Sequence, residues 1–317
     1  MWTTPNYKSF VKWRIEVWVD GKKEFNHVLD LKDQKVYIAF ESKSIGDTIA
    51  WFPYIEEFRK KHECEVICST FHNDWFKSKY PNIKFVNPGT PSFYTVFYKI
   101  GWFWDKNFHS NDTLDIPLQQ TASDILGLEY KEIIPKFKSL NPSPIKEKYV
   151  TISIQSTCQA KYWNHPTGWK QVVKYLQSKG YKVAVVDKYR NFGINNFMNA
   201  SPQCDYHFHN KPLEEVMEVI NGAEFHIGIG SGLSWLAWAL NTPTILISSF
   251  SKPWCEFQTN CIRIYNESPT SGYFNTHKLD ASDWNWYPFQ KIESMEDWHK
   301  IETITPDLVI EGIDRIL

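Results

Sequence analysis

The stretch HIGIGSGLSWLAWAL, residues 226–240, decides the fold that we expect for this chain. Its short apolar start predicts a buried strand, and the apolar segment after Ser231 predicts a helix. Three glycines at alternate positions, Gly228, Gly230 and Gly232, lie between the two and predict a tight turn. A strand, a glycine turn and a helix in this order are typical of a Rossmann-like unit, in which ligands bind beyond the carboxyl ends of the strands.

The composition is that of a globular protein with two domains. The chain has 317 residues, of which 42% are hydrophobic and 22% charged. Its 35 basic and 36 acidic side chains give a net charge of -1, which disfavours binding of nucleic acid through the phosphates. The 15 Trp, 16 Tyr and 21 Phe residues suit either sugar-binding surfaces or large aromatic cores, and we favour cores.

The cysteines and the first residues of the chain predict a cytoplasmic protein. The six cysteines are dispersed and form no Cys-x-x-Cys pair, and residues 1–18 contain no apolar core like that of a secretion signal. No run approaches the roughly 18 apolar residues that a membrane span needs. We therefore expect no transmembrane segment.

Strand and helix patterns alternate along two parts of the chain. Residues 1–35 predict a β-hairpin around an Asp20-Gly21 turn, and the alternation begins at Val36. It restarts at Tyr149 after a stretch rich in proline and charge, residues 139–148. This pattern predicts two doubly wound α/β domains with a cleft between them. The expected boundaries are a hairpin at 1–35, an N-terminal Rossmann-like domain at 36–145 and a C-terminal Rossmann-like domain at 146–317.

The individual elements follow from the same patterns. We expect Gly180 to end one helix and Pro212 to lie in the first turn of another, and residues 264–298 to be irregular. The expected strands are 36–40, 65–70, 82–88, 94–104, 149–154, 182–187, 225–230 and 244–248. Residues 46–62 are expected to form a loop and an amphipathic helix, and the other expected helices are 121–128, 167–180, 212–223, 233–240 and 305–317.

The loop after the first of these strands carries Gly46 and Asp47 at the start of a helix. Gly46 permits a tight turn. Asp47 has two interpretations: a helix N-cap, which aspartate forms well, or a general base in the cleft. The residue alone leaves both open.

The loop after residues 149–154 offers groups that suit a diphosphate. Ser156 and Thr157 supply hydroxyls, Lys161 supplies a cation, and a helix from about Thr167 supplies free backbone N–H groups. An ordinary capped loop with a solvated lysine is the competing interpretation, and taken alone this loop favours it.

The glycine turn has the pattern Gly-x-Gly-x-Gly, whereas a nicotinamide dinucleotide site has Gly-x-Gly-x-x-Gly. The acidic residue that such a site carries about 20 positions further on is also missing. We predict instead that backbone N–H groups of Ser231, Gly232, Leu233 and Ser234 hold a phosphate at the start of a helix. A close-packed turn without a ligand is the alternative.

The sequence predicts no metal and no cofactor. It contains no Asp-x-Asp pair and no His/Cys grouping with zinc spacing. It also lacks a Walker loop and a Gly-x-Ser-x-Gly elbow. A leaving group would then be neutralised by Lys161, hydroxyl groups and helix ends.

Three motifs in a fixed order resemble one family. SIGDTIAWFP, residues 44–53, resembles the Gly-Asp loop of the ADP-heptose transferases, the glycosyltransferases that extend lipopolysaccharide cores. KYWNHP, residues 161–166, is similar to their Lys-x-Trp loop, and GSGLSWLAWALNTPTI, residues 230–245, to their later loop and helix. These segments, with FSKPWCEF at 250–257, are closer still to the bacterial autotransporter heptosyltransferases, which glycosylate serines on secreted adhesins. The resemblance covers about residues 36–260.

The resemblance implies a GT-B fold, inversion at the anomeric carbon and no metal. The N-terminal domain would hold the acceptor and the C-terminal domain the nucleotide-sugar. Asp47 matches the catalytic base of the family. The matching phosphate ligands are Ser156, Thr157 and Lys161 in one loop and Ser231, Gly232, Leu233 and Ser234 in the other, and the candidate substrate contacts are Gly46, Trp163, Trp235 and Asp187.

Two positions depart from the pattern of the lipopolysaccharide enzymes, with Gly230 in place of Asp and Trp235 in place of His. Both departures put the sugar contacts in doubt. The autotransporter enzymes also carry a four-cysteine iron-binding motif near the C-terminus, whereas residues 262–317 contain no cysteine here. Neither the iron nor the large ring assembly of that family is therefore carried over. For Asp187, a ribose contact and a surface turn are equally good interpretations.

The leading hypothesis is an inverting, metal-independent glycosyltransferase. It would move a sugar, heptose from ADP-heptose in the first place, to a hydroxyl on a protein or a glycan. A non-catalytic sugar- or nucleotide-binding protein of the same fold is the alternative, and an oxidoreductase rests on the glycines alone.

Overall fold

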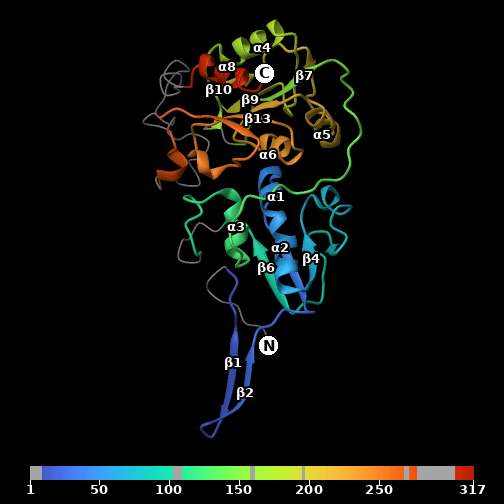
Figure 1. The fold of residues 1–317 in the computed structure, drawn as a ribbon, viewed down its shortest axis with the longest axis vertical. Helices are drawn as coiled ribbons and strands as arrows, with labels where there is room; N and C mark the ends of the chain where they lie inside the picture. The colour runs from blue at the N-terminus through green and yellow to red at the C-terminus, as the bar shows by residue number, and fades with distance from the viewer. Residues whose placement is uncertain (1–8, 103–108, 158–160, 195–196, 268–270, 277–303) are drawn as a thin grey trace. The chain divides into compact units, whose positions relative to one another are not determined.

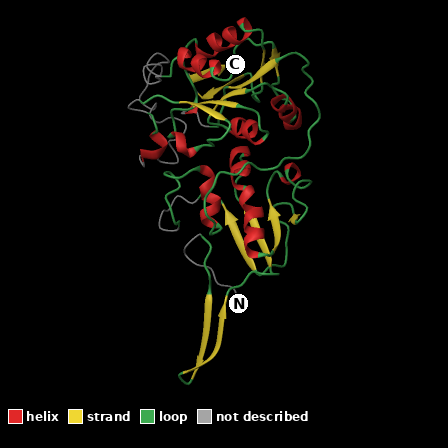
Figure 2. Cartoon of the chain, in the orientation of Figure 1, coloured by secondary structure: helices red, strands yellow, loops and turns green. Residues whose placement is uncertain are grey.

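The computed structural model describes residues 9–102, 109–157, 161–194, 197–267, 271–276 and 304–317. The chain divides into two compact units, Met1–Lys138 and Ser139–Leu317, which are described one at a time. Each unit contains a parallel β-sheet with helices packed on it (Figures 1 and 2). The predicted α/β fold is confirmed in both.

The N-terminal unit is built on a four-stranded parallel sheet with the order β5-β4-β3-β6. Helix α2 packs against β4, and α3 packs against both β6 and α1 (Figure 1). The sheet strands are β3 (Lys35–Phe40), β4 (Glu65–Ser69), β5 (Ile83–Phe85) and β6 (Val96–Ile100), and the helices are α1 (Ile45–Trp51), α2 (Pro53–His62), η1 (Asn73–Trp75) and α3 (Leu118–Ile125).

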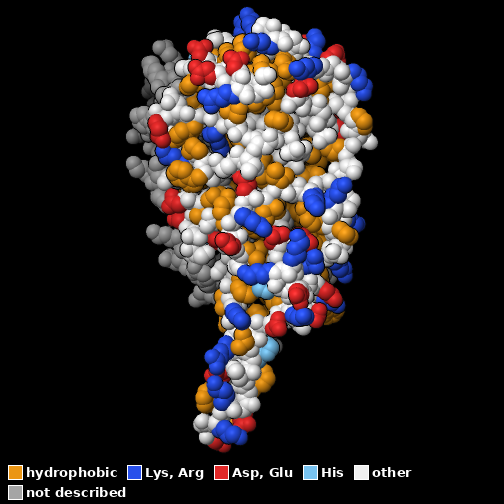
Figure 3. All heavy atoms as spheres, viewed as in Figure 1, with side chains coloured by type: hydrophobic (Ala, Val, Ile, Leu, Met, Phe, Trp, Pro, Cys, Tyr) orange, Lys and Arg blue, Asp and Glu red, His pale blue; other side chains and the backbone are white. Residues whose placement is uncertain are grey.

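A β-hairpin precedes this sheet, as the sequence predicts. Its antiparallel strands are β1 (Arg14–Val19) and β2 (Lys22–Val28), and Asp20 and Gly21 join them with positive φ angles of 50° and 79°. The large apolar side chains of the hairpin face solvent, among them Trp18, which is 56% exposed. They lie interspersed with Lys and Arg side chains in Figure 3.

Residues 46–62, for which we predicted a loop and one amphipathic helix, belong to two helices. Proline has no N–H, and this breaks the hydrogen-bond ladder at Pro53. The chain compensates with a tighter turn, in which Ile55 N donates to Phe52 O at 3.0 Å. Helix α1 therefore ends at Trp51, and α2 begins at Pro53.

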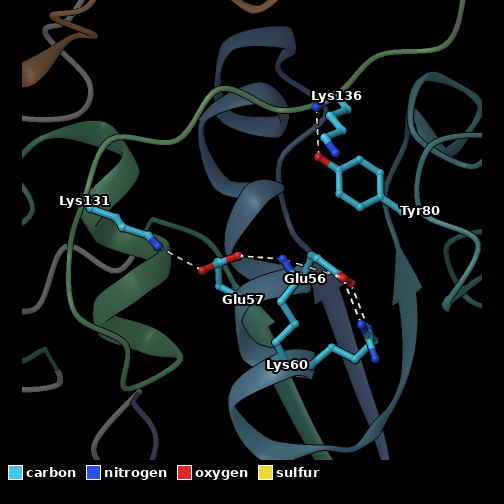
Figure 4. Close-up of polar contacts among 7 residues, drawn as sticks. Glu56, Glu57, Lys60, Tyr80, Lys131 and Lys136 are labelled. Carbon is cyan, nitrogen blue, oxygen red and sulfur yellow. Dashed lines mark hydrogen bonds and ion pairs between the residues drawn. The ribbon is translucent and has the colours of Figure 1, made fainter.

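Polar contacts fix α2 to the segment that closes the N-terminal unit (Figure 4). Glu57 lies between Lys60, at 3.2 Å, and Lys131, at 3.1 Å. Tyr80 accepts a hydrogen bond from the backbone N–H of Lys136 at 2.8 Å, and burial raises the pKa of its hydroxyl. These contacts hold residues 131–136 against the face that carries α1 and α2.

The C-terminal unit contains a six-stranded parallel sheet with the order β11-β8-β7-β12-β13-β14. Helices α4 and α8 pack together on one face, and α5 and α6 on the other (Figure 1). The strands are β7 (Tyr149–Ser153), β8 (Lys182–Val185), β11 (Tyr206–His207), β12 (His226–Ile229), β13 (Thr244–Ile247) and β14 (Cys261–Ile264), and the helices are α4 (Gly168–Ser178), α5 (Leu213–Asn221), α6 (Gly232–Ala239), η4 (Pro253–Cys255), η5 (Tyr273–Thr276) and α8 (Pro306–Asp314).

Helix ends in this unit follow the expected signals with one correction. Gly180 ends α4 with a φ of 85°, and the N–H of Tyr181 donates to Leu176 O at 3.1 Å, the pattern of a Schellman cap. Pro212 is the N-cap of α5, one position before the first turn where we placed it. Its ψ of 143° is extended, which keeps it outside the helix.

Three features of the C-terminal unit were not predicted. Strands β9 (Asn191–Ile194) and β10 (Phe197–Ala200) form a separate antiparallel hairpin, and β11 adds a two-residue edge to the sheet. Strand β14 lies partly in the range that we expected to be irregular. No α-helix separates β13 from β14, so the alternation of strand and helix is interrupted there.

A buried polar row crosses the centre of this sheet. The ring of His226 contacts Thr151 Oγ1 through Nδ1 and Ser153 Oγ through Nε2, both at 3.0 Å. Burial lowers the pKa of His226 to about 3, so the ring is neutral at physiological pH. Gly228 allows this row to form, because a Cβ at that position would lie 2.6 Å from His226 Nε2 and Ser153 Oγ and would also meet Ser234 Oγ.

We expect the substitution Gly228→Ala to destabilise the C-terminal unit by about 1–3 kcal/mol, because the new methyl group overpacks this row. Urea unfolding measures the loss. Gly312→Ala is the matched control: its methyl group would crowd the flexible Cδ1 end of Ile264 at 2.6 Å and make an ordinary contact with Ile262 at 3.6 Å, and alanine favours the helix. Equal stability of the two variants would contradict the close packing at Gly228.

Candidate functional site

Asp47 lies at the third position of α1, directly beyond the carboxyl end of β3. The N-cap is Ser44, whose backbone oxygen accepts from the hydroxyl of Thr48 at 2.8 Å, so the N-cap interpretation of Asp47 is wrong. Asp47 is half-buried, and its Oδ2 accepts a hydrogen bond from the indole N–H of Trp102 at 3.1 Å. Gly46 is buried within the helix. The contact with Trp102 orients a carboxylate at the strand edge where ligands bind in this class of fold.

In the C-terminal unit, a buried carboxylate shapes the loop after β7. Asp187 is 1% exposed and accepts hydrogen bonds from Ile154 N at 2.7 Å and from Gln155 N at 3.1 Å. The surface-turn interpretation of Asp187 is therefore wrong. Burial raises its pKa to about 7, although the two N–H groups oppose the shift. The side chain of Asp187 thus fixes the backbone that leads directly to Ser156.

The three groups predicted in this loop lie close together along the chain. Ser156 is half-buried, and its carbonyl accepts from the hydroxyl of Tyr162 at 3.0 Å, while Thr157 is exposed. The ammonium group of Lys161 lies 5.9 Å from the ring centroid of Phe250, in the segment after β13. Lys161 therefore brings the loop after β7 into contact with the segment after β13.

The loop after β12 ends in the N-terminus of α6. Ser231 is the N-cap, but its side chain makes no capping bond. Its Oγ is buried and has no hydrogen-bond partner among the described residues. Gly232, Leu233 and Ser234 form the first turn, where backbone N–H groups have no partner within the helix. Ser234 uses its own hydroxyl for Ile229 O at 2.7 Å, which leaves its backbone N–H as the group that a ligand can reach.

Both positions that depart from the lipopolysaccharide pattern contact one carboxylate. The indole N–H of Trp235 donates to Glu256 Oε2 at 2.6 Å. A Cβ on Gly230 would lie 3.0 Å from Glu256 Oε1. Trp235 itself is 3% exposed, with its ring packed on Phe257 at a centroid distance of 5.0 Å.

Trp163 lies in the core of the C-terminal unit. It is 2% exposed, its indole N–H donates to Ile304 O at 2.8 Å, and its ring lies against Gly168 at the start of α4. These contacts support a role in holding the loop after β7 in place. As a substrate contact, Trp163 stays a prediction, as do Trp235 and Gly46.

The described parts of the chain contain no group of three or more His, Cys, Asp or Glu side chains that could hold a metal ion. The sequence after Cys261 contains no cysteine, so it does not supply a four-cysteine set. Within the same described parts, no helix is both long and apolar enough to span a membrane.

The sequence of this chain also matches a known family. A model for glycosyltransferase family 9 (heptosyltransferase) matches residues 107–276, more than half of the chain. The chain belongs to glycosyltransferase family 9. It is therefore a glycosyltransferase, and the resemblance found in the sequence is confirmed.

Two relatives set the place of the chain within family 9. The autotransporter heptosyltransferase TibC of Escherichia coli O78:H11 is 36% identical over 92% of this chain and 74% of its own length. The inactive autotransporter heptosyltransferase BimC of Burkholderia thailandensis is 29% identical over 88% of this chain and 68% of its own length. The chain is thus more similar to TibC than to this inactive relative.

The structure of TibC also matches. The crystal structure of dodecameric iron-containing TibC in complex with ADP-D-β-D-heptose has a TM-score of 0.91 and 34% identity, covering 99% of this chain and 84% of that chain. This match confirms the GT-B type of fold for the family 9 chain.

Three residues of the candidate site escaped the sequence analysis. Trp102, Phe250 and Glu256 reach Asp47, Lys161 and Trp235 respectively from segments distant in the sequence. Glu256 is part of a segment, residues 250–257, that did contribute to the resemblance. The local sequence around these three residues contains no motif that predicts such long-range contacts.

The raised pKa of Asp187 predicts a pH dependence of stability. The folded state binds this proton more tightly than the unfolded state, so the contribution of Asp187 is present at low pH and is lost as the pH rises from about 4 to above 7. We expect the free energy of unfolding of the wild type, minus that of Asp187→Asn, to fall by at least about 1 kcal/mol over this range in urea titrations.

Asp205→Asn is the matched control for this measurement. Although desolvation opposes the shift, hydrogen bonds from Gln177 and from Lys182, each at 2.9 Å, lower the pKa of Asp205, so its contribution does not change between pH 5 and 8. If the difference in free energy of unfolding between the wild type and Asp187→Asn stayed constant from pH 5 to 8, Asp187 would be ionised over that whole range.

Proposed function

We propose that this protein is an inverting glycosyltransferase that moves heptose from ADP-heptose to a hydroxyl group of a protein or a glycan. The observation that supports this most strongly is the hydroxyl of Ser231, which is buried at the N-terminus of α6 with no partner among the residues that the structure describes. A buried hydroxyl that lacks a partner costs free energy, and a phosphate oxygen would satisfy it.

The proposed reaction is a single displacement. The Asp47 carboxylate takes the proton from the acceptor hydroxyl while the hydroxyl oxygen attacks the anomeric carbon of the donor. The bond between that carbon and the diphosphate breaks with its electron pair on the diphosphate oxygen. Attack opposite the leaving group inverts the configuration. The hydrogen bond from the indole N–H of Trp102 to Oδ2 orients this carboxylate.

The C-terminal unit would stabilise the leaving diphosphate. Lys161 supplies a positive charge, and no carboxylate pairs with it in the described part of the chain. The first turn of α6 supplies backbone N–H groups and the positive end of the helix dipole. The hydroxyls of Ser156, Thr157 and Ser231 complete the set. These groups are the means by which we propose that the transfer proceeds without a metal.

The relatives support the choice of donor and acceptor. TibC was crystallised with ADP-D-β-D-heptose, and TibC is named an autotransporter heptosyltransferase. We therefore propose ADP-heptose as the donor and a hydroxyl of a secreted adhesin as the first acceptor to test. The free cysteines Cys64, Cys68, Cys204, Cys255 and Cys261 fit a reducing compartment, in which the transfer would precede secretion.

We expect Asp47→Asn to lower the rate of heptose transfer by about 10²- to 10⁴-fold, because the acceptor loses its general base. Transfer of radiolabelled heptose from ADP-heptose to an acceptor adhesin measures the rate, and ADP affinity should not change. Asp33→Asn is the control, since Asp33 is exposed and its φ of 58° is one that asparagine also adopts. Transfer by Asp47→Asn at the wild-type rate would remove Asp47 from this role.

Ser231→Ala and Lys161→Met should each weaken ADP binding by about tenfold or more, because each removes a charge-assisted contact with phosphate. Calorimetric titration with ADP measures this. The ligand-free Ser231→Ala protein should be as stable as the wild type or more so, since no bond is lost. Lys174→Met, on the exposed face of α4, is the control for Lys161→Met. Unchanged ADP affinity in both variants would place the diphosphate elsewhere.

A further inference from the structure

Glu256 presents one free carboxylate oxygen at the end of β12. It is half-buried in the segment between β13 and β14. Its Oε2 is held by the indole N–H of Trp235 at 2.6 Å. Its Oε1 lies 3.0 Å from the place where a Cβ on Gly230 would stand, and within the described residues no donor reaches this oxygen.

The absence of a side chain at position 230 leaves room for this carboxylate. Ser248 Oγ lies 3.8 Å from the same Cβ position, so the space above Gly230 is lined by polar groups. Ser231, the next residue, is the N-cap of α6 with the unpartnered buried hydroxyl. Glu256 Oε1 therefore lies beside the place proposed for the donor diphosphate.

The chemistry of a carboxylate decides which part of a donor it can contact. An ionised carboxylate only accepts hydrogen bonds, and it repels the negative charge of a diphosphate. The groups of a nucleotide-sugar that donate hydrogen bonds are its hydroxyls and the amino group of the base. The diphosphate has the hydroxyls of the transferred sugar on one side and those of the ribose on the other, and a comparison of ADP with ADP-heptose distinguishes the two.

We propose that Glu256 is a specificity-determining residue that accepts a hydrogen bond from a hydroxyl of the transferred sugar, and that Trp235 positions it. Trp235 is enclosed by the rings of Trp238 and Phe257, at centroid distances of 5.4 and 5.0 Å, so its N–H is fixed in direction. A carboxylate held at one oxygen by a rigid donor presents the other oxygen in a defined position. This assignment rests on the proposed use of a nucleotide-sugar donor.

The test compares ADP with ADP-heptose, which differ only in the heptose. Calorimetric titration gives the dissociation constant of each for the wild type and for Glu256→Gln. We expect the wild type to bind ADP-heptose more tightly than ADP. We expect Glu256→Gln to reduce this preference by about tenfold or more, with ADP affinity changed less than twofold, because a charge-assisted hydrogen bond to the sugar is lost. A contact with the ribose or the base would instead weaken both ligands.

Two further variants keep the result interpretable. Trp235→Phe retains a ring in the core but removes the N–H, and it should lower the preference for ADP-heptose while Glu256 remains. Glu311→Gln changes an exposed carboxylate on α8 to the same amide and should leave both constants unchanged.

Three outcomes would overturn the assignment. An unchanged preference in Glu256→Gln would show that the carboxylate does not contact the sugar. An equal loss of ADP and ADP-heptose affinity would show that it supports the phosphate loop instead. A wild type that binds neither ligand would overturn the proposed function itself, and the sugar contact with it.

Discussion

The carboxylate of Asp187 accepts hydrogen bonds from two successive backbone N–H groups, and the shape of the loop after β7 depends on this contact. It joins the end of β8 to the loop that follows β7, and it fixes the backbone conformation of the two residues before Ser156. Most buried carboxylates are paired with a cation, whereas this one is balanced by peptide dipoles. It is therefore sensitive to solvent and to protons in a way that an apolar contact would not be.

The sequence predicted the parts of the fold that follow from local patterning. Buried apolar runs located β3, β4, β7, β8, β12 and β13, and the Asp20-Gly21 pair located the hairpin turn. The break at Pro53 was missed although proline is a local signal, because the apolar pattern continues on both sides of it. Strand β14 was missed because no helix precedes it. For the candidate site, the sequence located the loops, but it could not give the partners of Asp47 and Trp235, since these lie 55 and 21 residues away.

Aromatic residues account for much of the long-range order in both units. Phe52 stacks on Phe76 at a centroid distance of 3.7 Å in the N-terminal core, as the preference for aromatic cores predicted. The tryptophans do more than fill space, because their N–H groups reach distant partners: Trp51 contacts Leu118 O, and Trp163 contacts Ile304 O. Each such hydrogen bond fixes the orientation of a buried indole ring. Hydrogen bonds from tryptophan N–H groups also orient the carboxylates of Asp47 and Glu256. One kind of interaction therefore supports both the packing of the cores and the geometry of the candidate site.

The connection between β13 and β14, residues 248–260, contains only a short 3₁₀ turn and no α-helix. This segment carries Phe250 and Glu256 to the ends of the neighbouring strands. A helix in this position would be constrained by the face of the sheet that it covers, whereas this segment is held by a few side chains, among them Glu256 on the N–H of Trp235 and Phe257 on its ring. Its exposed positions can therefore change over evolution with little effect on the sheet. Under the proposed function, a new sugar preference arises through this one segment, while Asp47, Lys161 and Ser231 stay as they are.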